Sequence, residues 1–511
     1  MYYFVGNNIG HKTAGIEKAM INRLNLFKAY HYQAKILLLA WNRYLTQTAS
    51  QYINSEDYVN MYDYFQEASN VTSVFSKNWL HYWRDECGYT IKPVSETNDV
   101  LIYDQQQFIM YAHFADEAYQ KIDYINYFDT SRRKIKRELY DTRGFLSCVR
   151  VLSTDQKIQA EYYLSPQGNV KIEKYYDINS NHPYEAKKII LNHLGNTHFL
   201  NNETELGAFF IETIYQNSDL FFSDRNLVTS HIFNIVASYI PVIAVLHSTH
   251  VKDVTDLAHS PIKNVYKGVF EHLQRYKAII VSTQQQKADV IERISGVIPV
   301  YAIPVGYSSI DMKNYSNENK YVSPKKIISV ARYSPEKQLI QQIELINKLK
   351  DAFPNIELHM YGFGKEEQHL KERIQELGLE KHVILRGFLK DLTDEYQDAY
   401  LNLITSNMEG FSLALLECES HGVPSISYDI QYGPGELIQD GKNGYLVEKN
   451  NQHMLFEKVK LLLNNPQLQQ SFSHHCIETA QKYSRTQIML LWKNLRSEER
   501  RVGKECRSRW S

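Results

Sequence analysis

The 511-residue sequence has five cysteines and a formal net charge of only −1. The cysteines are scattered, at positions 87, 148, 418, 476 and 506, which fits neither a metal site nor a disulfide framework. The lack of excess positive charge argues against a nucleic-acid-binding protein. No apolar run reaches membrane-spanning length, and the N-terminus lacks the basic start and small-residue cleavage site of a secretory signal. We therefore expect a cytoplasmic protein with reduced cysteines.

What the sequence does contain is ordinary globular composition, with 43% hydrophobic and 23% charged residues. The length predicts two or three domains. The last sixteen residues, 496–511, turn abruptly basic. They resemble the in-frame translation of a common sequencing adapter, and we expect an assembly artefact there, with the natural C-terminus missing. A genuine basic tail is the alternative.

The N-terminal pattern predicts a Rossmann-like domain. The strand in "MYYFVGNNIG" runs into a glycine-containing turn, and "IEKAMINRLNLFKAY" has helical apolar spacing. The next strand is "QAKILLLAW", and the α/β pattern resumes later with "SDLFFSDRN", "PVIAVLHSTH" and "YKAIIVSTQQQ". We assign residues 1–96 and 201–305 to this domain.

Residues 97–200 show alternating apolar and polar residues, which predicts an antiparallel meander inserted into the first domain. Its many tyrosines fit ordinary strand positions, and a role in acceptor binding or self-association is the alternative. Its basic run "RRKIKRE" contains Lys134, Lys136 and Arg137. These side chains could meet a polyanion, or they could form a solvated strand face.

Residues 306–325 are polar and predict a linker between the domains. A second α/β pattern then covers residues 326–480, with strands such as "KIISVAR", "IELHMYGFG", "AYLNLITS" and "PSISYD". A last helical pattern at 481–495 is expected to cross back onto the first domain.

The stretch "EGFSLALLE" predicts a loop that turns into a helix. Ser412 is expected to cap a helix that begins at Leu413 and stops at Gly422. Glu409 then lies on the loop and Glu417 on the second helical turn. A helix N-terminus attracts phosphate, and two carboxylates beside it suit sugar hydroxyls. The alternative is a capped surface helix with two solvated acids.

His247 and His250 form an H-x-x-H pair at the end of a predicted strand. In open α/β sheets, polar residues at such ends line the ligand crevice. A histidine at a strand end is more often structural, and zinc is not expected because no third ligand stands nearby.

Four features of the second domain occur in a set order: Arg332 and Lys337 in "IISVARYSPEK", "YGFG" at 361–364, "RGF" at 386–388, and "EGFSLALLE". Together they resemble the donor half of a family 4 retaining glycosyltransferase. The resemblance covers nearly all of residues 1–495. It implies the GT-B fold, an α/β architecture of two facing Rossmann-like domains, here with a β-rich insert.

The resemblance also implies roles for residues. Arg332 and Lys337 would bind the diphosphate of a UDP-sugar where another fold would use Mg²⁺, so no metal or other cofactor is expected. Glu409 would contact the donor hexose and Glu417 the ribose. His250, or else His247, would face the sugar from the first domain. The remaining donor or acceptor positions that it implies are Gly15, Tyr361, Gly362, Gly364, Arg386, Gly387, Gly410, Phe411, Ser412 and Leu413.

Three further segments resemble a narrower subgroup of these glycosyltransferases. The insert before "LHSTH", the "IPVG" before the linker and "SYDIQYGPGELIQDGKNGYLV" are similar to wall teichoic acid glycosyltransferases and adhesin-modifying N-acetylglucosaminyltransferases of Gram-positive bacteria. The opening "NNIGHKTAGIEKAMINRLNLF" looks most like the poly(glycerol-phosphate) α-glucosyltransferases.

This subgroup implies retaining transfer of a hexose, glucose favoured, from a UDP-sugar to poly(glycerol-phosphate). The alternatives are N-acetylglucosamine transfer to a ribitol-phosphate polymer or to Ser/Thr of an adhesin, and a non-catalytic partner subunit. The resemblance also implies a homo-oligomer formed through the insert. A place at the inner membrane face would fit a lipid-linked acceptor.

Overall fold

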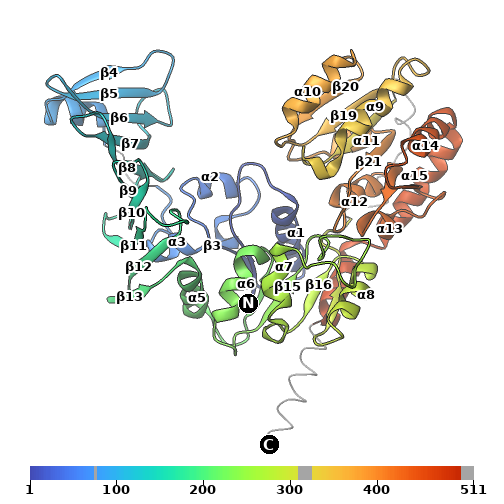
Figure 1. Ribbon diagram of the computed structural model, residues 1–511, viewed down its shortest axis with the longest axis horizontal. Helices are drawn as coiled ribbons and strands as arrows, with labels where there is room; N and C mark the ends of the chain where they lie inside the picture. Colours follow the sequence, from blue (N-terminus) through green and yellow to red (C-terminus); the bar gives the residue numbers. More distant parts are fainter. Residues whose placement is uncertain (74–76, 309–324, 496–511) are drawn as a thin grey trace, which may run out of the picture. The chain divides into compact units, whose positions relative to one another are not determined.

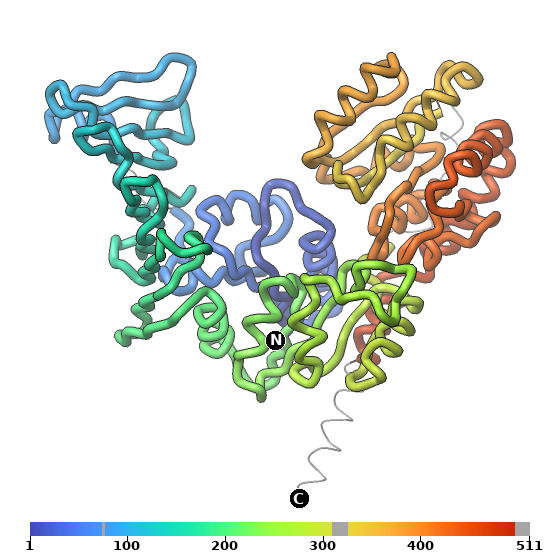
Figure 2. Tube along the Cα trace, in the orientation of Figure 1, coloured from blue at the N-terminus to red at the C-terminus, as the bar shows by residue number. Residues whose placement is uncertain are grey.

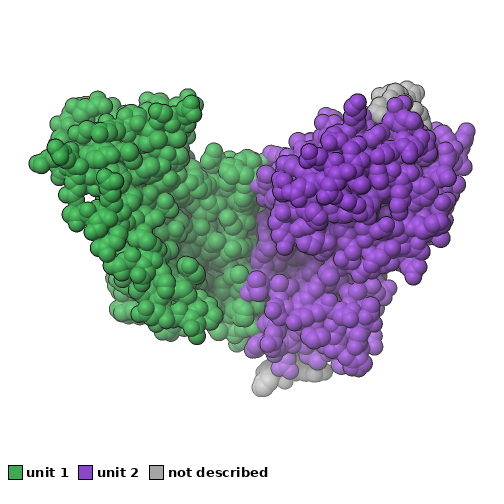
Figure 3. Space-filling model, turned by 45° about the horizontal axis from the view of Figure 1, so that its top comes forward, with its two compact units in different colours: residues 1–11, 34–221, 228–241 green, residues 12–33, 222–227, 242–511 purple. Residues whose placement is uncertain are grey.

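The computed structural model describes residues 1–73, 77–308 and 325–495. Most of the expected linker and all of the expected artefact lie outside these residues. The chain divides by its contacts into two compact units, coloured separately in Figure 3. Unit 1 comprises residues 1–11, 34–221 and 228–241, and unit 2 comprises 12–33, 222–227 and 242–511. This division differs from the one made on the sequence, whose domain boundaries remain predictions.

The expected N-terminal strands form one seven-stranded sheet in the order β17-β16-β15-β14-β1-β2-β3. The strands are short and almost wholly buried, as expected for parallel strands covered on both faces. They are β1 (Tyr2–Gly6), β2 (Ala34–Leu38), β3 (Tyr58–Asn60), β14 (Leu220–Ser223), β15 (Val242–Val245), β16 (Ile279–Val281) and β17 (Val300–Ala302).

The helices between these strands are labelled in Figure 1 where there is room. They are α1 (Gly15–Ala29), α2 (Leu45–Ala49), α3 (Met61–Phe65), α4 (Trp79–His81), α5 (Glu203–Ile214), α6 (Asn226–Ile235), α7 (Asn264–Phe270) and α8 (Gln284–Arg293). No helix of the described residues is long and apolar enough to cross a membrane.

The insert is a ten-stranded antiparallel meander, which confirms the prediction, and its course can be followed in Figure 2. Strands β4 to β13 pair in sequence order. Their bounds are β4 (Thr90–Pro93), β5 (Asp99–Asp104), β6 (Gln107–Phe114), β7 (Ile122–Phe128), β8 (Lys134–Tyr140), β9 (Leu146–Leu152), β10 (Ile158–Leu164), β11 (Val170–Tyr176), β12 (Ala186–His193) and β13 (Asn196–Leu200). The sheet therefore begins at β4, before the predicted start at residue 97. The sequence pattern did not reveal β4 because it is a short, mostly exposed edge strand without apolar alternation.

Several tyrosines of the insert do more than occupy strand positions. The hydroxyls of Tyr163 and Tyr176 donate to buried Glu161 over 2.8 and 2.6 Å, and Arg150 pairs with the same carboxylate at 2.6 Å. Burial opposes ionisation of Glu161, but Arg150 and the other partners outweigh it and lower its pKa.

Two residues of the basic run "RRKIKRE" are already engaged on the sheet. Lys136 pairs with Glu138 at 2.9 Å, and Arg137 donates to Asn126 over 2.7 Å. These contacts favour the interpretation of the run as part of the strand surface.

The second parallel sheet, in unit 2, has the strand order β20-β19-β18-β21-β22-β23. Its first and fourth strands in the chain are neighbours, so the winding reverses direction between β18 and β21. Doubly wound sheets bind ligands at such a switch point. The strands are β18 (Lys326–Val330), β19 (Glu357–Tyr361), β20 (Val383–Gly387), β21 (Leu401–Ile404), β22 (Ser425–Asp429) and β23 (Gly444–Glu448).

Helices separate these strands, and their apolar faces form the main core of unit 2 together with the sheet. They are α9 (Leu339–Leu349), α10 (Glu367–Glu376), α11 (Thr393–Gln397), α12 (Leu413–Ser420), α13 (Gly433–Leu437), α14 (Gln452–Asn464) and α15 (Pro466–Gln481). The two Rossmann-like sheets and the β-rich insert agree with the predicted fold class.

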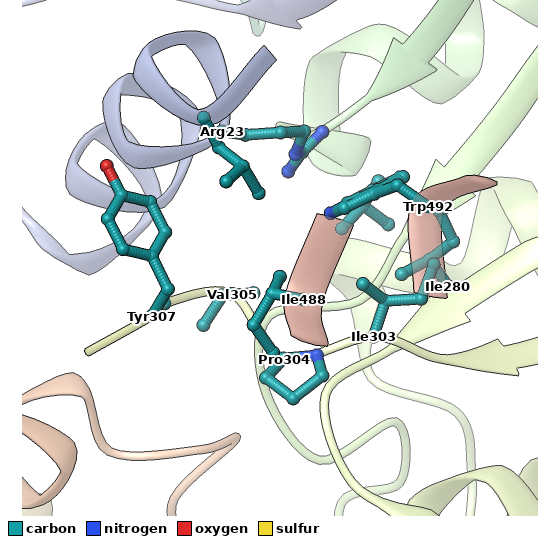
Figure 4. A pocket seen from close by; sticks show the side chains of 11 residues that line it. Arg23, Ile280, Ile303, Pro304, Val305, Tyr307, Ile488 and Trp492 are labelled. Atoms are coloured by element: carbon teal, nitrogen blue, oxygen red, sulfur yellow. The ribbon is translucent and has the colours of Figure 1, made fainter. Parts of the chain in front are cut away.

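The last described helix, residues 485–495, lies against α1 within unit 2. The ring of Trp492 meets Phe27 and Phe222 edge-on, with centroids 5.4 and 5.6 Å apart. A small pocket remains here, and Figure 4 shows Arg23 and Trp492 on its wall. The pocket is lined by none of the predicted site residues, so we assign it to packing.

Replacing Trp492 with alanine is expected to lower the free energy of unfolding by about 3–5 kcal/mol, because a large buried ring is lost from this contact. Urea unfolding measures the change. Leu490→Ala is the matched control, since Leu490 lies on the same helix with half its surface exposed. Equal effects of the two substitutions would contradict the role given to Trp492.

Candidate active site

The centre of the site is an ion pair at the switch point of the second sheet. Lys337 ends a short 3-10 helix, Pro335–Lys337, on the loop after β18. Glu409 lies on the loop after β21. Lys337 Nζ and Glu409 Oε1 are 2.6 Å apart, and each side chain is only 14% exposed. Two residues that the sequence predicts as ligands of one donor thus meet at the place where this fold binds ligands.

Hydrogen bonds fix the two loops to one another. The Thr405 hydroxyl donates to the Lys337 carbonyl over 2.9 Å, and the Asn407 N–H donates to the Glu336 carbonyl over 2.7 Å. The Ser406 hydroxyl donates to Glu409 Oε1 over 2.7 Å. The side-chain contacts of Glu409 with Lys337 and Ser406 therefore both use Oε1 and not Oε2.

The backbone around Glu409 is also held from the loop after β22. The Glu409 N–H donates to the Gln431 carbonyl over 3.0 Å, and the Tyr432 N–H donates to the Glu409 carbonyl over 2.8 Å. This pairing orients the carboxylate without using it.

The residues after Glu409 pack rather than face outward. A Cβ at Gly410 would lie 2.3 Å from the His247 carbonyl oxygen, so only glycine allows this close approach of two loops. Phe411 is buried in a core cluster against which Leu413 also packs. These positions shape the loop, and their side chains serve packing.

The prediction that Ser412 caps the helix is wrong in its chemistry. Ser412 does precede α12, but its side chain makes no capping hydrogen bond. Its φ of 70° lies in the left-handed region, which is uncommon for a residue other than glycine.

Arg332 lies on the same loop as Lys337 and is 58% exposed. Its guanidinium pairs with Glu336 at 2.9 Å. Partial burial opposes ionisation of Glu336, but the polar groups beside it and the charges of Arg332 and Lys337 lower its pKa. The two predicted diphosphate ligands are thus on one loop, each with a carboxylate partner.

Glu417 lies on the second turn of α12, as predicted. Lys18 of α1 pairs with its Oε1 at 2.5 Å, and the Tyr396 hydroxyl donates to Oε2 over 2.8 Å. The sequence analysis missed both partners. Nothing local marks them, because Lys18 and Tyr396 reach Glu417 only through the tertiary fold.

The "YGFG" loop has a clear backbone reason for its glycines. A Cβ at Gly362 would lie 1.9 Å from the Ala331 carbonyl oxygen, and one at Gly364 would lie 2.2 Å from that of Tyr333. The loop after β19 therefore packs directly against the loop that carries Arg332. Tyr361 itself is buried, with its hydroxyl on Glu395, and its side chain serves the core.

Arg386 and Gly387 end β20, two strands from the switch point. Arg386 is exposed and its Nε lies 3.3 Å from His359 Nδ1. The Gly387 carbonyl accepts the Gly362 N–H over 2.9 Å. The structure does not bring the Arg386 side chain into contact with Lys337 or Glu409.

His247 belongs to a buried charge cluster that the sequence did not reveal. Its Nε2 lies 2.8 Å from Asp224 Oδ1, and Arg23 donates to both oxygens of Asp224, over 2.7 and 3.2 Å. Asp224 is fully buried at the end of β14. Burial opposes its ionisation, but Arg23 and His247 outweigh burial and hold its pKa below the usual range.

His250 is completely buried. Its ring stacks between Phe270 and Tyr432, with centroids 5.8 and 6.4 Å away. Burial, with smaller effects of Arg293 and Lys263, lowers its pKa to about 4, so the imidazole is neutral at pH 7.

Gly15 begins α1, and a Cβ there would meet no atom within 4 Å. The fold itself therefore does not require glycine at this position. The described residues include no group of three or more His, Cys, Asp or Glu side chains arranged to hold a metal.

Replacing Asp224 with alanine would leave Arg23 buried without its carboxylate and should lower the free energy of unfolding by about 3–5 kcal/mol. The exposed Asp256→Ala is the control. The pKa of Asp224 is lower in the folded protein than in the unfolded chain. The stability that ionised Asp224 contributes is therefore present above the unfolded pKa and is lost as pH falls through the folded pKa. Urea unfolding from pH 7 down to pH 3 should therefore show a difference between wild type and Asp224→Ala that shrinks with acid; a constant difference would contradict this.

Comparison with known protein families gives two matches that together cover most of the chain. A family of accessory Sec system proteins matches residues 12–309, and the family described as Glycosyl transferases group 1 matches residues 312–483. The first match covers more than half of the chain.

Three relatives differ in length and in their named activities. The poly(glycerol-phosphate) alpha-glucosyltransferase of Bacillus subtilis strain 168 is 28% identical over 73% of this chain, which spans only 55% of that protein. The poly(ribitol-phosphate) alpha-N-acetylglucosaminyltransferase of Staphylococcus aureus strain COL is 25% identical over 85% of this chain and 86% of its own. The GtfA subunit of the UDP-N-acetylglucosamine–peptide N-acetylglucosaminyltransferase of Streptococcus gordonii is 24% identical over 98% of each.

Among solved structures, a mutant of TarM from S. aureus, in complex with fondaparinux, alpha-GlcNAc-glycerol and UDP, has a TM-score of 0.83. The identity is 21%, and the match covers 97% of this chain and 99% of that one. This likeness shows the fold. The chain therefore belongs to the family of accessory Sec system proteins whose model matches residues 12–309, and it has the GT-B fold, with residues 312–483 similar to the Glycosyl transferases group 1 family.

Proposed function

We propose that this protein transfers a hexose, glucose favoured, from a UDP-sugar to poly(glycerol-phosphate) with retention of configuration. The observation that carries the proposal is the ion pair of Lys337 and Glu409 at the switch point of the second sheet. The preference for glucose and glycerol-phosphate is supported by the named activity of the B. subtilis relative and by the opening segment of the sequence.

The charges of the site suit a diphosphate leaving group. Lys337 and Arg332 stand on one loop, and two fixed cations stabilise the negative charge that develops as UDP departs. Their carboxylate partners hold them in place before the donor arrives. No divalent metal is needed for this stabilisation in the proposed mechanism.

Glu409 acts in this proposal as a ligand of the hexose. Its Oε1 is occupied by Lys337 and Ser406, and Oε2 is left to accept from a sugar hydroxyl. A carboxylate paired with a lysine is a weak nucleophile, and glycosidase-type retention needs two suitably spaced carboxyl groups. We therefore favour attack on the face from which UDP leaves, with the departing phosphate oxygen taking the acceptor proton.

Two other functions have specific support. N-acetylglucosamine transfer to a ribitol-phosphate polymer or to peptide Ser/Thr is named for two relatives of similar length. A non-catalytic partner subunit is suggested by the match to an accessory protein family. A non-catalytic subunit is expected to lack some of the charged residues that bind the donor in an active enzyme. All four of them, Arg332, Lys337, Glu409 and Glu417, are present here.

The deciding experiment assays each of two donors, UDP-glucose and UDP-N-acetylglucosamine, with each of three acceptors: glycerol-phosphate polymer, ribitol-phosphate polymer and a Ser/Thr-rich peptide. Release of UDP and sugar incorporation are measured with and without EDTA. We expect most turnover with UDP-glucose and glycerol-phosphate polymer, unchanged by EDTA. No UDP release with any pair would refute the enzymatic function, and strict Mg²⁺ dependence would refute the role of the two cations.

Replacing Lys337 with alanine should lower kcat by about 10²–10³-fold, the effect of removing one charge-stabilising group at a leaving group. Glu417→Gln should instead raise the donor KM with a smaller change in kcat, because its proposed contact is to the ribose. Lys371→Ala is the control, since Lys371 is exposed on α10. Wild-type turnover in Lys337→Ala would contradict the assignment.

We further propose that the insert mediates self-association. Its sheet ends at β4 and β13, and unpaired edges tend to be covered by another strand or chain. On the β13 side, Leu194 and Phe199 expose 81% and 68% of their surface. Leu194→Glu with Phe199→Glu should reduce the mass in solution measured by light scattering while leaving UDP binding unchanged. An unchanged mass would exclude this edge as the contact.

A further inference from the structure

Lys263 has an unusual environment for a lysine. It precedes α7, and its ammonium contacts the Thr249 hydroxyl and, at 3.0 Å, the Met408 sulfur. Both partners are neutral. Within residues 1–73, 77–308 and 325–495, no carboxylate pairs with this ammonium, although Lys263 is partly buried. A cation that has lost water without gaining an anion is a favourable place for an anionic ligand.

The same turn contains a buried group with unused hydrogen-bonding capacity. The Lys263 N–H donates to the His250 carbonyl over 2.9 Å. His250 Nδ1 lies 3.5 Å from the Tyr432 hydroxyl, whereas its Nε2 is buried without a hydrogen-bond partner in the described chain. Burial lowers the pKa of His250, and the positive charges of Arg293 and Lys263 add to this effect.

The position of Lys263 relative to the donor site distinguishes it from Lys337. Met408, which touches Lys263, is the chain neighbour of Glu409, which pairs with Lys337. Two lysines therefore contact neighbouring residues of one loop: Lys263 contacts Met408, and Lys337 contacts Glu409. The Cα atoms of two consecutive residues are about 3.8 Å apart. If Glu409 holds the hexose, Lys263 contacts the same loop one residue away from that group.

We propose that Lys263, with the Thr249 hydroxyl, binds a phosphodiester of the acceptor next to the hydroxyl that receives the hexose. This rests on the proposed function. A lysine binds phosphate as a point charge, and the threonine hydroxyl can donate to a second phosphate oxygen. The weak contact to the Met408 sulfur is given up when the phosphate binds. The site would select acceptors that carry a phosphodiester over neutral polyols.

The test compares Lys263→Met and Lys263→Arg with wild type. Lys263→Met should raise the KM for glycerol-phosphate polymer about tenfold to a hundredfold, with kcat changed less, because one charge-assisted contact is lost. UDP affinity, measured by calorimetric titration, should stay at the wild-type value. Lys263→Arg should restore part of the acceptor affinity. Lys267→Met is the matched control, since Lys267 is 64% exposed on α7.

Direct binding of a short glycerol-phosphate oligomer to each variant gives a readout independent of turnover. Weaker oligomer binding by Lys263→Met supports the site even if the donor sugar has been misassigned. An equal loss of UDP affinity would overturn the proposal by making Lys263 a donor ligand. Wild-type oligomer binding by a folded Lys263→Met protein would overturn it by leaving the residue a packing role. Urea unfolding of each variant verifies that the compared proteins are folded.

Discussion

The ion pair of Lys337 and Glu409 is the contact on which the arrangement of the candidate site depends. It joins the loops after β18 and β21, the two strands between which the winding of the sheet reverses. A mostly buried pair loses hydration, and its attraction stabilises the fold only when further hydrogen bonds satisfy its atoms. Ser406 supplies one to Glu409, and Thr405 ties the Lys337 backbone to the same loop. The pair therefore fixes two loops as well as two charges.

Close approaches of main chain make that contact geometrically possible. Gly362 and Gly364 let the loop after β19 lie on the loop that carries Arg332, and Gly410 lets the Glu409 loop pass the His247 carbonyl. At each position a Cβ would overlap a carbonyl oxygen. The glycines of these motifs are thus explained by protein packing alone, before any ligand is considered. Their effect on function is indirect, because they determine how closely the charged side chains can be assembled.

Most charged residues of the site already have an opposite charge beside them. Arg332 pairs with Glu336, Glu417 with Lys18, and Lys337 with Glu409. Such pairing holds each group in place at the cost of a partial exchange of contacts when a ligand binds. Lys263 differs, because its contacts are to a hydroxyl and a sulfur. This contrast separates the groups proposed to hold the donor from the one proposed to meet the acceptor.

The sequence by itself determined the strand and helix pattern, the inserted meander and the placing of Arg332, Lys337, Glu409 and Glu417 on loops and a helix turn, because these depend on local periodicity and chain order. Only the tertiary structure decided which groups meet. Lys18 reaching Glu417 depends on packing between segments distant in the chain, and so does the cluster around Asp224. The capping prediction for Ser412 failed because it used local propensity alone, whereas the backbone there is left-handed and the side chain makes no capping hydrogen bond.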